Sequence, residues 1–324
     1  MNTVTPAPYR AYTPLRQLPP GTGAPPRRQF MPRSKYEELV RRAQELLPVL
    51  DAPPLDWALA QRAHDPEYLA RWRAGRVTHD EELALGFKWT PELVRRAELA
   101  CGGTLQATLD ALDTGWSVNL AGGTHHAHHD RPGGFSFVND VVIATRYVLD
   151  TGLARRVLIL DLDVHQGNGT AAMLRHEPRA FTLSVHAERN YPFRKESSDL
   201  DIGLPDGTRD EAYLSALDRA ALPAASAFRP DLVYHLAGAD VLAGDQLGRL
   251  ALTVGGLRTR DERVATWAAR NGISLVTITA GGYNRDPDLL IAARLATLHA
   301  GLTAMHHARD TTARPKPRTS PQEA

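Results

Sequence analysis

Cysteine is almost absent from this 324-residue chain, whose single example is Cys101. One cysteine cannot form an intrachain disulfide, and it excludes a zinc site built from several thiolates. A charge excess is also lacking, since 38 Lys and Arg stand against 37 Asp and Glu, giving a net charge of +1. A dedicated nucleic-acid surface normally needs a basic excess, so we expect no direct nucleic-acid partner.

Long apolar runs and targeting signals are lacking too. We find no apolar stretch long enough to span a bilayer, and the N-terminus "MNTVTPAPYR" has no signal-peptide pattern. We therefore expect a cytoplasmic protein with no membrane partner. Hydrophobic residues make up 43% of the chain, which is enough to bury a sizeable core. Nothing in the sequence indicates an oligomeric state.

The two ends of the chain differ from its middle. Residues 14–33 are rich in proline, glycine and arginine, which predicts an irregular segment lying over a domain. We expect disorder over residues 1–8 and in the polar, proline-bearing tail 305–324, with one folded domain at 9–304 between them. The histidine pair at 306–307 begins that tail, so we expect it to be solvated.

Between the ends, short aliphatic and β-branched runs alternate with amphipathic helical stretches. The strand-like runs are 116–123, 155–165, 180–187, 231–240 and 273–283, and the helical stretches are 136–150, 169–176, 210–227, 259–271 and 286–302. Near-continuous apolar strands that alternate with helices are typical of a parallel sheet covered on both faces. We predict an α/β fold, with a single domain in which helices flank both faces of a central, mostly parallel sheet.

Each strand-like run ends in polar or glycine residues, and ligands bind at the carboxyl ends of strands in open parallel sheets. The most informative end is "DLDVHQGNG". In extended backbone, residues two apart point to the same side. Asp161, Asp163 and His165 therefore form one row, while Leu162 and Val164 turn into the packing.

Three polar residues in one row of an apolar strand need partners, because unpaired buried charge is expensive. Asp163 and His165 alone would more often form a simple ion pair. Asp240, at the end of "HLAGAD", can however supply a third ligand to a divalent cation. Two carboxylates and one imidazole leave an open coordination position, as catalytic zinc sites do, and the same set also suits Fe2+, Co2+ or Mn2+.

Four motifs together resemble the zinc-dependent histone deacetylase family, above all its bacterial members and its class IV branch. They are "GGTHHAHHDRPGGFSFVND", "DLDVHQGNGT", "GADVLAGDQLGRL" and "GGYN", in the order and spacing of that family. The resemblance covers roughly residues 9–304 and implies the arginase/deacetylase fold, with the metal at the C-terminal edge of the sheet. It implies that Asp163, His165 and Asp240 bind zinc.

The resemblance also implies the other roles in the site. His125 and His126 match the paired catalytic histidines, of which His126 is the better candidate for the general base. Asp161 matches the carboxylate that orients His125. Asn168 stands where some branches have aspartate as the partner of His126, and it supplies no negative charge. Tyr283 matches the tyrosine that polarises the substrate carbonyl, although a tyrosine after two glycines is also often a packed turn residue.

The remaining matched positions concern the substrate tunnel and a second cation. The expected tunnel residues are Gly134, Phe135, Leu247, Gly281 and Gly282. The resemblance also implies a structural K+ ion, held partly through backbone carbonyls, at Asp161, Asp163, His165, Ser184 and Val185. His128 and His129 match no catalytic position, and we expect both at the surface.

The leading interpretation is a metal-dependent amide hydrolase that removes an acetyl or longer acyl group from lysine side chains by attack of metal-bound water. A small acylated amine such as an acetylpolyamine is the first alternative substrate, but Leu247 stands where polyamine-selective relatives carry an acidic gatekeeper. A catalytically silent binder of acyl-lysine is the second alternative. An arginase-type two-metal hydrolase would need more ligands than are visible.

Overall fold

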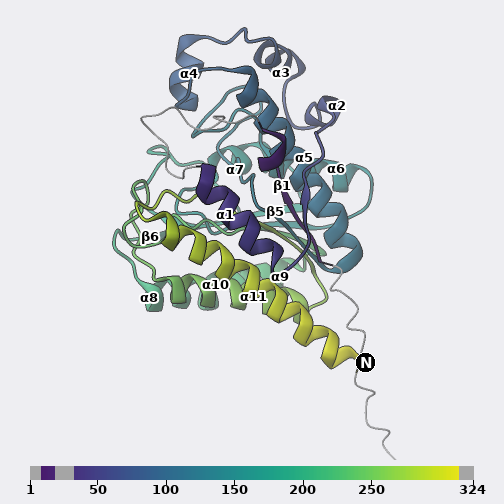
Figure 1. Cartoon of the computed structure of the whole chain (residues 1–324), viewed down its shortest axis with the longest axis vertical. Coiled ribbons are helices and arrows are strands. Elements are labelled where there is room, and N and C mark those ends of the chain that lie inside the picture. Colours follow the sequence, from purple (N-terminus) through teal and green to yellow (C-terminus); the bar gives the residue numbers. More distant parts are fainter. Residues whose placement is uncertain (1–8, 19–32, 314–324) are drawn as a thin grey trace, which may run out of the picture.

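The computed structural model describes residues 9–18 and 33–313, which fold around a sheet of eight strands that all run parallel (Figure 1). The strand order is β2-β1-β3-β8-β7-β4-β5-β6. The strands are β1 Ala11–Thr13, β2 Val49–Asp51, β3 Trp116–Asn119, β4 Val157–Asp161, β5 Ala180–Ala187, β6 Leu200–Leu204, β7 Leu232–Leu236 and β8 Ser274–Ile278. The predicted single-domain α/β fold is confirmed, and its sheet is entirely parallel.

Helices connect the strands. They are η1 Leu15–Gln17, α1 Arg33–Gln44, α2 Trp57–Ala60, α3 Pro66–Arg73, α4 His79–Leu85, α5 Pro91–Thr114, α6 Asp140–Asp150, α7 Asn168–Leu174, α8 Asp210–Ala216, the π-helical η3 Leu217–Ala221, α9 Leu222–Phe228, α10 Val254–Arg270 and α11 Pro287–Ala313. The five helical stretches expected from the sequence are all present. We had predicted no strands or helices before residue 116, and this segment contributes β1, β2 and five α-helices.

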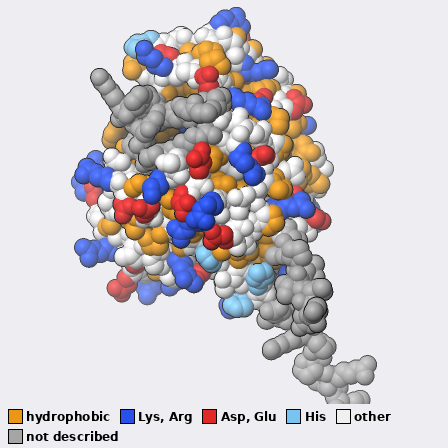
Figure 2. All heavy atoms as spheres, in the orientation of Figure 1, with side chains coloured by type: hydrophobic (Ala, Val, Ile, Leu, Met, Phe, Trp, Pro, Cys, Tyr) orange, Lys and Arg blue, Asp and Glu red, His pale blue; other side chains and the backbone are white. Residues whose placement is uncertain are grey.

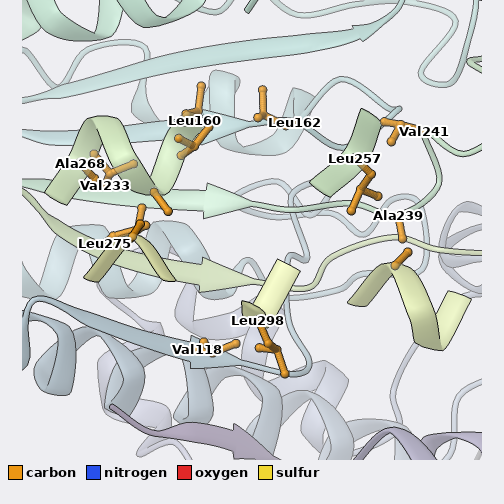
Figure 3. Packing of buried hydrophobic residues seen from close by; sticks show 14 of the residues in the cluster. Val118, Leu160, Leu162, Val233, Ala239, Val241, Leu257, Ala268, Leu275 and Leu298 are labelled. Atoms are coloured by element: carbon orange, nitrogen blue, oxygen red, sulfur yellow. The ribbon is translucent and has the colours of Figure 1, made fainter. Parts of the chain in front are cut away.

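Alternating side chains divide the strands between two cores. On β4, Leu158 and Leu160 pack on one face of the sheet, while Val157 and Ile159 pack on the other. The first core lies under α10 and α11 and includes Leu257 and other apolar side chains labelled in Figure 3. Because both faces of the sheet are covered, the residues of each strand form a nearly continuous apolar run in the sequence.

The C-terminal helix α11 is longer than expected. We placed the end of the folded domain at residue 304, but α11 continues to Ala313, and beyond the buried Met305 its side chains His306 and Arg309 pack against the ring of Tyr9. By length and composition, Pro287–Arg309 could cross a bilayer, contrary to our expectation that no such stretch exists. However, 67% of its most apolar window is buried inside the protein, against α10 and α1, as in a core helix.

The expected disorder at residues 1–8 and 314–324, and most of the irregular segment 14–33, lie outside the described residues. His306 and His307 are exposed at the end of α11, and the ring of His306 packs near Tyr9. On the face drawn in Figure 2, basic and acidic side chains are mixed, in keeping with the net charge of +1.

Candidate metal and active site

The candidate site lies where β4, β7 and β8 end. We had expected Asp163 and His165 to lie in the strand. β4 stops at Asp161, however, so both residues lie in the loop that follows it. The alternation nevertheless persists beyond the strand, since Leu162 and Val164 are fully buried in the core. The row of polar side chains therefore points into the site even though the ladder of hydrogen bonds has ended.

Three ligand atoms converge in this loop region. One ligand atom each from Asp163, His165 and Asp240 lies within 4.8 Å of the others, and all three residues are buried. Nδ1 of His165 lies 3.0 Å from Oδ1 of Asp163 and 3.3 Å from Oδ2 of Asp240. The backbone N–H of Val164 donates to Oδ1 of Asp240 at 3.0 Å. The Asp163–His165 pair that was the alternative to a metal site is therefore present, and Asp240 adds the third side chain that the metal site needs.

The donor set fits a divalent cation. Oδ2 of Asp240 is buried and accepts no hydrogen bond, and its one ion-pair contact among the described residues is with Nδ1 of His165 at 3.3 Å. Burial and the neighbouring Asp163 raise the pKa of Asp240 to about 7. A cation between Asp163 and Asp240 would give Oδ2 a partner and would offset the repulsion between the two carboxylates. The backbone of Gly281 packs directly against the ligand Asp240, where a Cβ would lie 2.0 Å from Oδ2 of Asp240.

His125 is oriented by Asp161. Its Nδ1 lies 2.6 Å from Oδ2 of Asp161, and its Nε2 lies 3.9 Å from Oδ1 of Asp163. Burial alone would lower the pKa of His125, but the negative charges of these two carboxylates outweigh it and raise the pKa to about 9. An imidazole held in this way favours the charged form and can stabilise negative charge near the metal ligands.

His126 differs from His125 in its partner. Its Nδ1 lies 2.7 Å from Oδ1 of Asn168, the neutral residue that stands where some branches have aspartate. Burial and the nearby His125 and His165 hold the pKa of His126 well below its ordinary value. The two adjacent histidines therefore differ in charge preference, and the neutral His126 is the one suited to accept a proton.

The expectation for His128 is wrong, because this side chain is buried. The loop turns inward after His126, and Nε2 of His128 lies 3.1 Å from Nδ2 of Asn168. Its Nδ1 faces the guanidinium of Arg131 at 3.1 Å. His129 is exposed, as we expected, although its Nδ1 donates to the carbonyl of Ala63. A His-x-His pattern beside the paired histidines was the signal that sequence reasoning passed over.

A cavity of about 450 Å³ opens above the ligand atoms. Its walls include all five residues expected in the tunnel, together with His125, His126, Asp163, His165 and Tyr283. Asp161, Asn168 and Asp240 lie behind this lining. Phe135 has φ +68°, and its ring lies 6.0 Å from that of Tyr283. The aromatic walls suit an apolar chain that leads to a polar floor.

Tyr191 is one of several wall residues that we did not predict from the sequence. Its ring stands edge-on to His126, with centroids 4.8 Å apart, and also lines the cavity. Tyr191 belongs to the loop after β5, which has no metal-ligand pattern, so only its aromatic "NYPF" composition could have marked it.

A buried arginine supports the ligands from below. Arg260 of α10 is fully buried, pairs with Asp261 at 2.7 Å, and donates to the carbonyls of Leu162 and Gly238 at 3.1 and 2.9 Å. These carbonyls lie just before the ligands Asp163 and Asp240. Arg260 therefore ties together the two loops that carry the carboxylate ligands.

The comparisons with known proteins agree with this geometry. The model of the histone deacetylase domain matches residues 29–299. The chain belongs to the histone deacetylase family. It is 36% identical to histone deacetylase 2 of Arabidopsis thaliana over 200 residues, which cover 61% of this chain and 52% of that protein. It is 30% identical to the histone deacetylase-like amidohydrolase of Pseudomonas aeruginosa over 255 residues, covering 74% and 67%.

A solved histone deacetylase structure has the same fold. The crystal structure of the HDA15 HD domain matches with a TM-score of 0.74 over 93% of each chain, at 23% identity. Of the residues expected to hold K+, Asp161 pairs with Ser184 in the ladder of β4 and β5, Val185 follows on β5, and Asp163 and His165 lie in the loop after β4. Oγ of Ser184 lies 2.9 Å from Nδ1 of His186. The K+ site remains a prediction.

Proposed function

We propose that this histone deacetylase homologue is a metal-dependent hydrolase that removes an acetyl or longer acyl group from lysine side chains. The observation that carries the proposal is the set of three converging ligand atoms, from Asp163, His165 and Asp240, at the base of a cavity whose lining includes Asp163, His165, His126 and Tyr283. Zinc is the family expectation for the metal, and Fe2+, Co2+ or Mn2+ would suit the same donors.

Asp163, His165 and Asp240 would hold the metal. When bound, a divalent cation there would polarise the substrate carbonyl and lower the pKa of a neighbouring water molecule. His126 then accepts the proton of the attacking water at Nε2, because its Nδ1 is directed at Asn168. The positively charged His125, held by Asp161, stabilises the negative charge that develops during attack.

The cavity walls position the acyl-lysine. Phe135 and Tyr191 contact the methylene chain of the lysine, while Tyr283 directs its hydroxyl at the developing oxyanion. Burial raises the pKa of Tyr283 well above its ordinary value, so this residue acts as a neutral hydrogen-bond donor. His126 returns its proton to the leaving amine, which departs as a free lysine side chain.

Tyr283→Phe tests this function and separates an enzyme from a silent binder. Losing one oxyanion donor should lower single-turnover hydrolysis of an acetyl-lysine peptide by about 10²–10³-fold. Affinity for the unreacted peptide should change little, because the interaction strengthens mainly as charge develops. Tyr191→Phe, at the wall of the same cavity, is the matched control and should keep most of the rate. Equal rates for Tyr283→Phe and the parent protein would remove Tyr283 from the mechanism.

A further inference from the structure

Exposed arginines gather at the mouth of the cavity. Arg96 of α5, Arg189 after β5 and Arg249 after β7 all line it, and they come from segments far apart in the sequence. We call these three residues the arginine rim. Within the described part of the chain, the only acidic residue of the cavity lining is Asp163, at the floor.

The arginine rim is only partly neutralised. Arg189 and Arg249 both approach the same carboxylate, Asp206, at 3.6 and 3.2 Å. One carboxylate can offset one guanidinium. Arg96 forms no ion pair with the residues that the structure describes. Three positive groups thus face one negative group, and the mouth carries a positive charge although the whole chain is nearly neutral.

Two exposed apolar side chains stand beside these charges. Phe193 is 88% exposed and Leu83 is 65% exposed, and both line the cavity. They are two of only four large hydrophobic side chains exposed among the described residues. An apolar side chain and an acidic side chain on one ligand would match this surface.

We propose that the arginine rim selects acyl-lysine peptides with acidic residues beside the acylated lysine. This inference rests on the proposed deacylase function and narrows its substrate. An acylated polyamine keeps a free ammonium outside the tunnel, where the rim repels it and Leu247 offers no carboxylate. An acidic neighbour of the acyl-lysine reaches the guanidiniums instead, and Leu83 and Phe193 contact the apolar part of the peptide.

The test uses three acetyl-lysine peptides that differ only in having Glu, Gln or Lys at the residues flanking the acetyl-lysine. We expect kcat/KM to fall from the Glu to the Gln to the Lys peptide, by about tenfold overall, and the difference to shrink at high salt. Arg96→Gln, Arg189→Gln and Arg249→Gln should each reduce the Glu/Lys ratio by about twofold, as expected for exposed charge pairs.

The matched control is Arg155→Gln. Arg155 is 89% exposed and pairs with Asp231 at the opposite edge of the sheet, just before β4, so its loss should leave the ratio unchanged. Equal kcat/KM for the three peptides, or faster hydrolysis of an acetylated polyamine than of the Glu peptide, would overturn the proposal.

Binding separates this inference from the proposed function. The affinities of the three peptides are measured with Tyr283→Phe as well as with the parent protein. Tighter binding of the Glu peptide without hydrolysis of any peptide would support the arginine rim and count against the deacylase. Hydrolysis of all three peptides with equal rates and equal affinities would support the deacylase function and refute the role of the arginine rim.

Discussion

Oδ1 of Asn168 lies 2.7 Å from Nδ1 of His126, so the amide oxygen holds the proton on Nδ1 and leaves Nε2 facing the site. An aspartate would do this in either orientation, because its two oxygens are equivalent. An asparagine does so only when its NH2 group points elsewhere. Nδ2 of Asn168 lies 3.1 Å from Nε2 of His128, which can accept its hydrogen bond. His128 therefore sets the direction of the amide.

His128→Ala should lower kcat by about 5–10-fold, because the orientation of Asn168 depends on one hydrogen bond worth about 1 kcal/mol. KM and metal content should be unchanged. In an Asn168→Asp background, the same change should cost less than about twofold, since a carboxylate needs no orientation. The measurement is a double-mutant cycle in kcat, with the exposed His129→Ala as control. An equal loss in both backgrounds would assign His128 a packing role only.

Arg131 provides a second test of the same contact. Its guanidinium approaches Nδ1 of His128 at 3.1 Å and competes with Asn168, because a neutral imidazole offers one acceptor nitrogen. Arg131→Gln should therefore leave kcat unchanged or raise it. A drop in kcat as large as that of His128→Ala would contradict this account.

Arg260→Met should destabilise the fold strongly. It leaves the buried carboxylate of Asp261 and the carbonyls of Leu162 and Gly238 without their cation, at a cost of about 3–5 kcal/mol. Arg258→Met, on the same helix but exposed and paired with Glu262, should cost less than about 1 kcal/mol. The measurement is urea unfolding of the two variants. Similar urea midpoints for Arg260→Met and Arg258→Met would refute the proposal that Arg260 supports the ligand loops.

Stability should fall in mild acid because of His64. Its Nε2 accepts from the N–H of Asn139 and its Nδ1 donates to the carbonyl of His129, so folding requires the neutral ring. Burial lowers its pKa to about 4, against 6.5 for the ordinary side chain. Below pH 6.5 the unfolded chain takes up a proton that the folded protein excludes, so this contribution is complete above pH 6.5 and is lost toward pH 4.

The loss due to His64 should reach about 3 kcal/mol. His64→Gln keeps both hydrogen bonds and cannot titrate, so its unfolding free energy should depend less on pH across this window. The exposed His176→Gln should retain the dependence of the parent protein. Identical pH profiles for His64→Gln and the parent would refute the role of His64.

The parallel sheet could be predicted because its strands are apolar on both faces, as Leu158 and Ile159 of β4 illustrate. The ligand set could be predicted because Asp163, His165 and Asp240 follow such strands. The burial of His128 could not be predicted from the sequence, because it depends on how a polar loop folds back on α7. Arg260 and Tyr191 also act through tertiary contacts that no local pattern records. The expected cytoplasmic location stays a prediction.

The most direct test is hydrolysis of an acetyl-lysine peptide before metal removal, after chelation and after addition of Zn2+ to the stripped protein. Metal removal should lower turnover by more than about 10²-fold, and Zn2+ should restore it. Asp240→Asn should remain folded by circular dichroism but bind Zn2+ more weakly and recover less activity, because it loses the charge of Oδ2. Full turnover by metal-free protein, or unchanged Zn2+ affinity in Asp240→Asn, would contradict the assignment of a catalytic metal to this site.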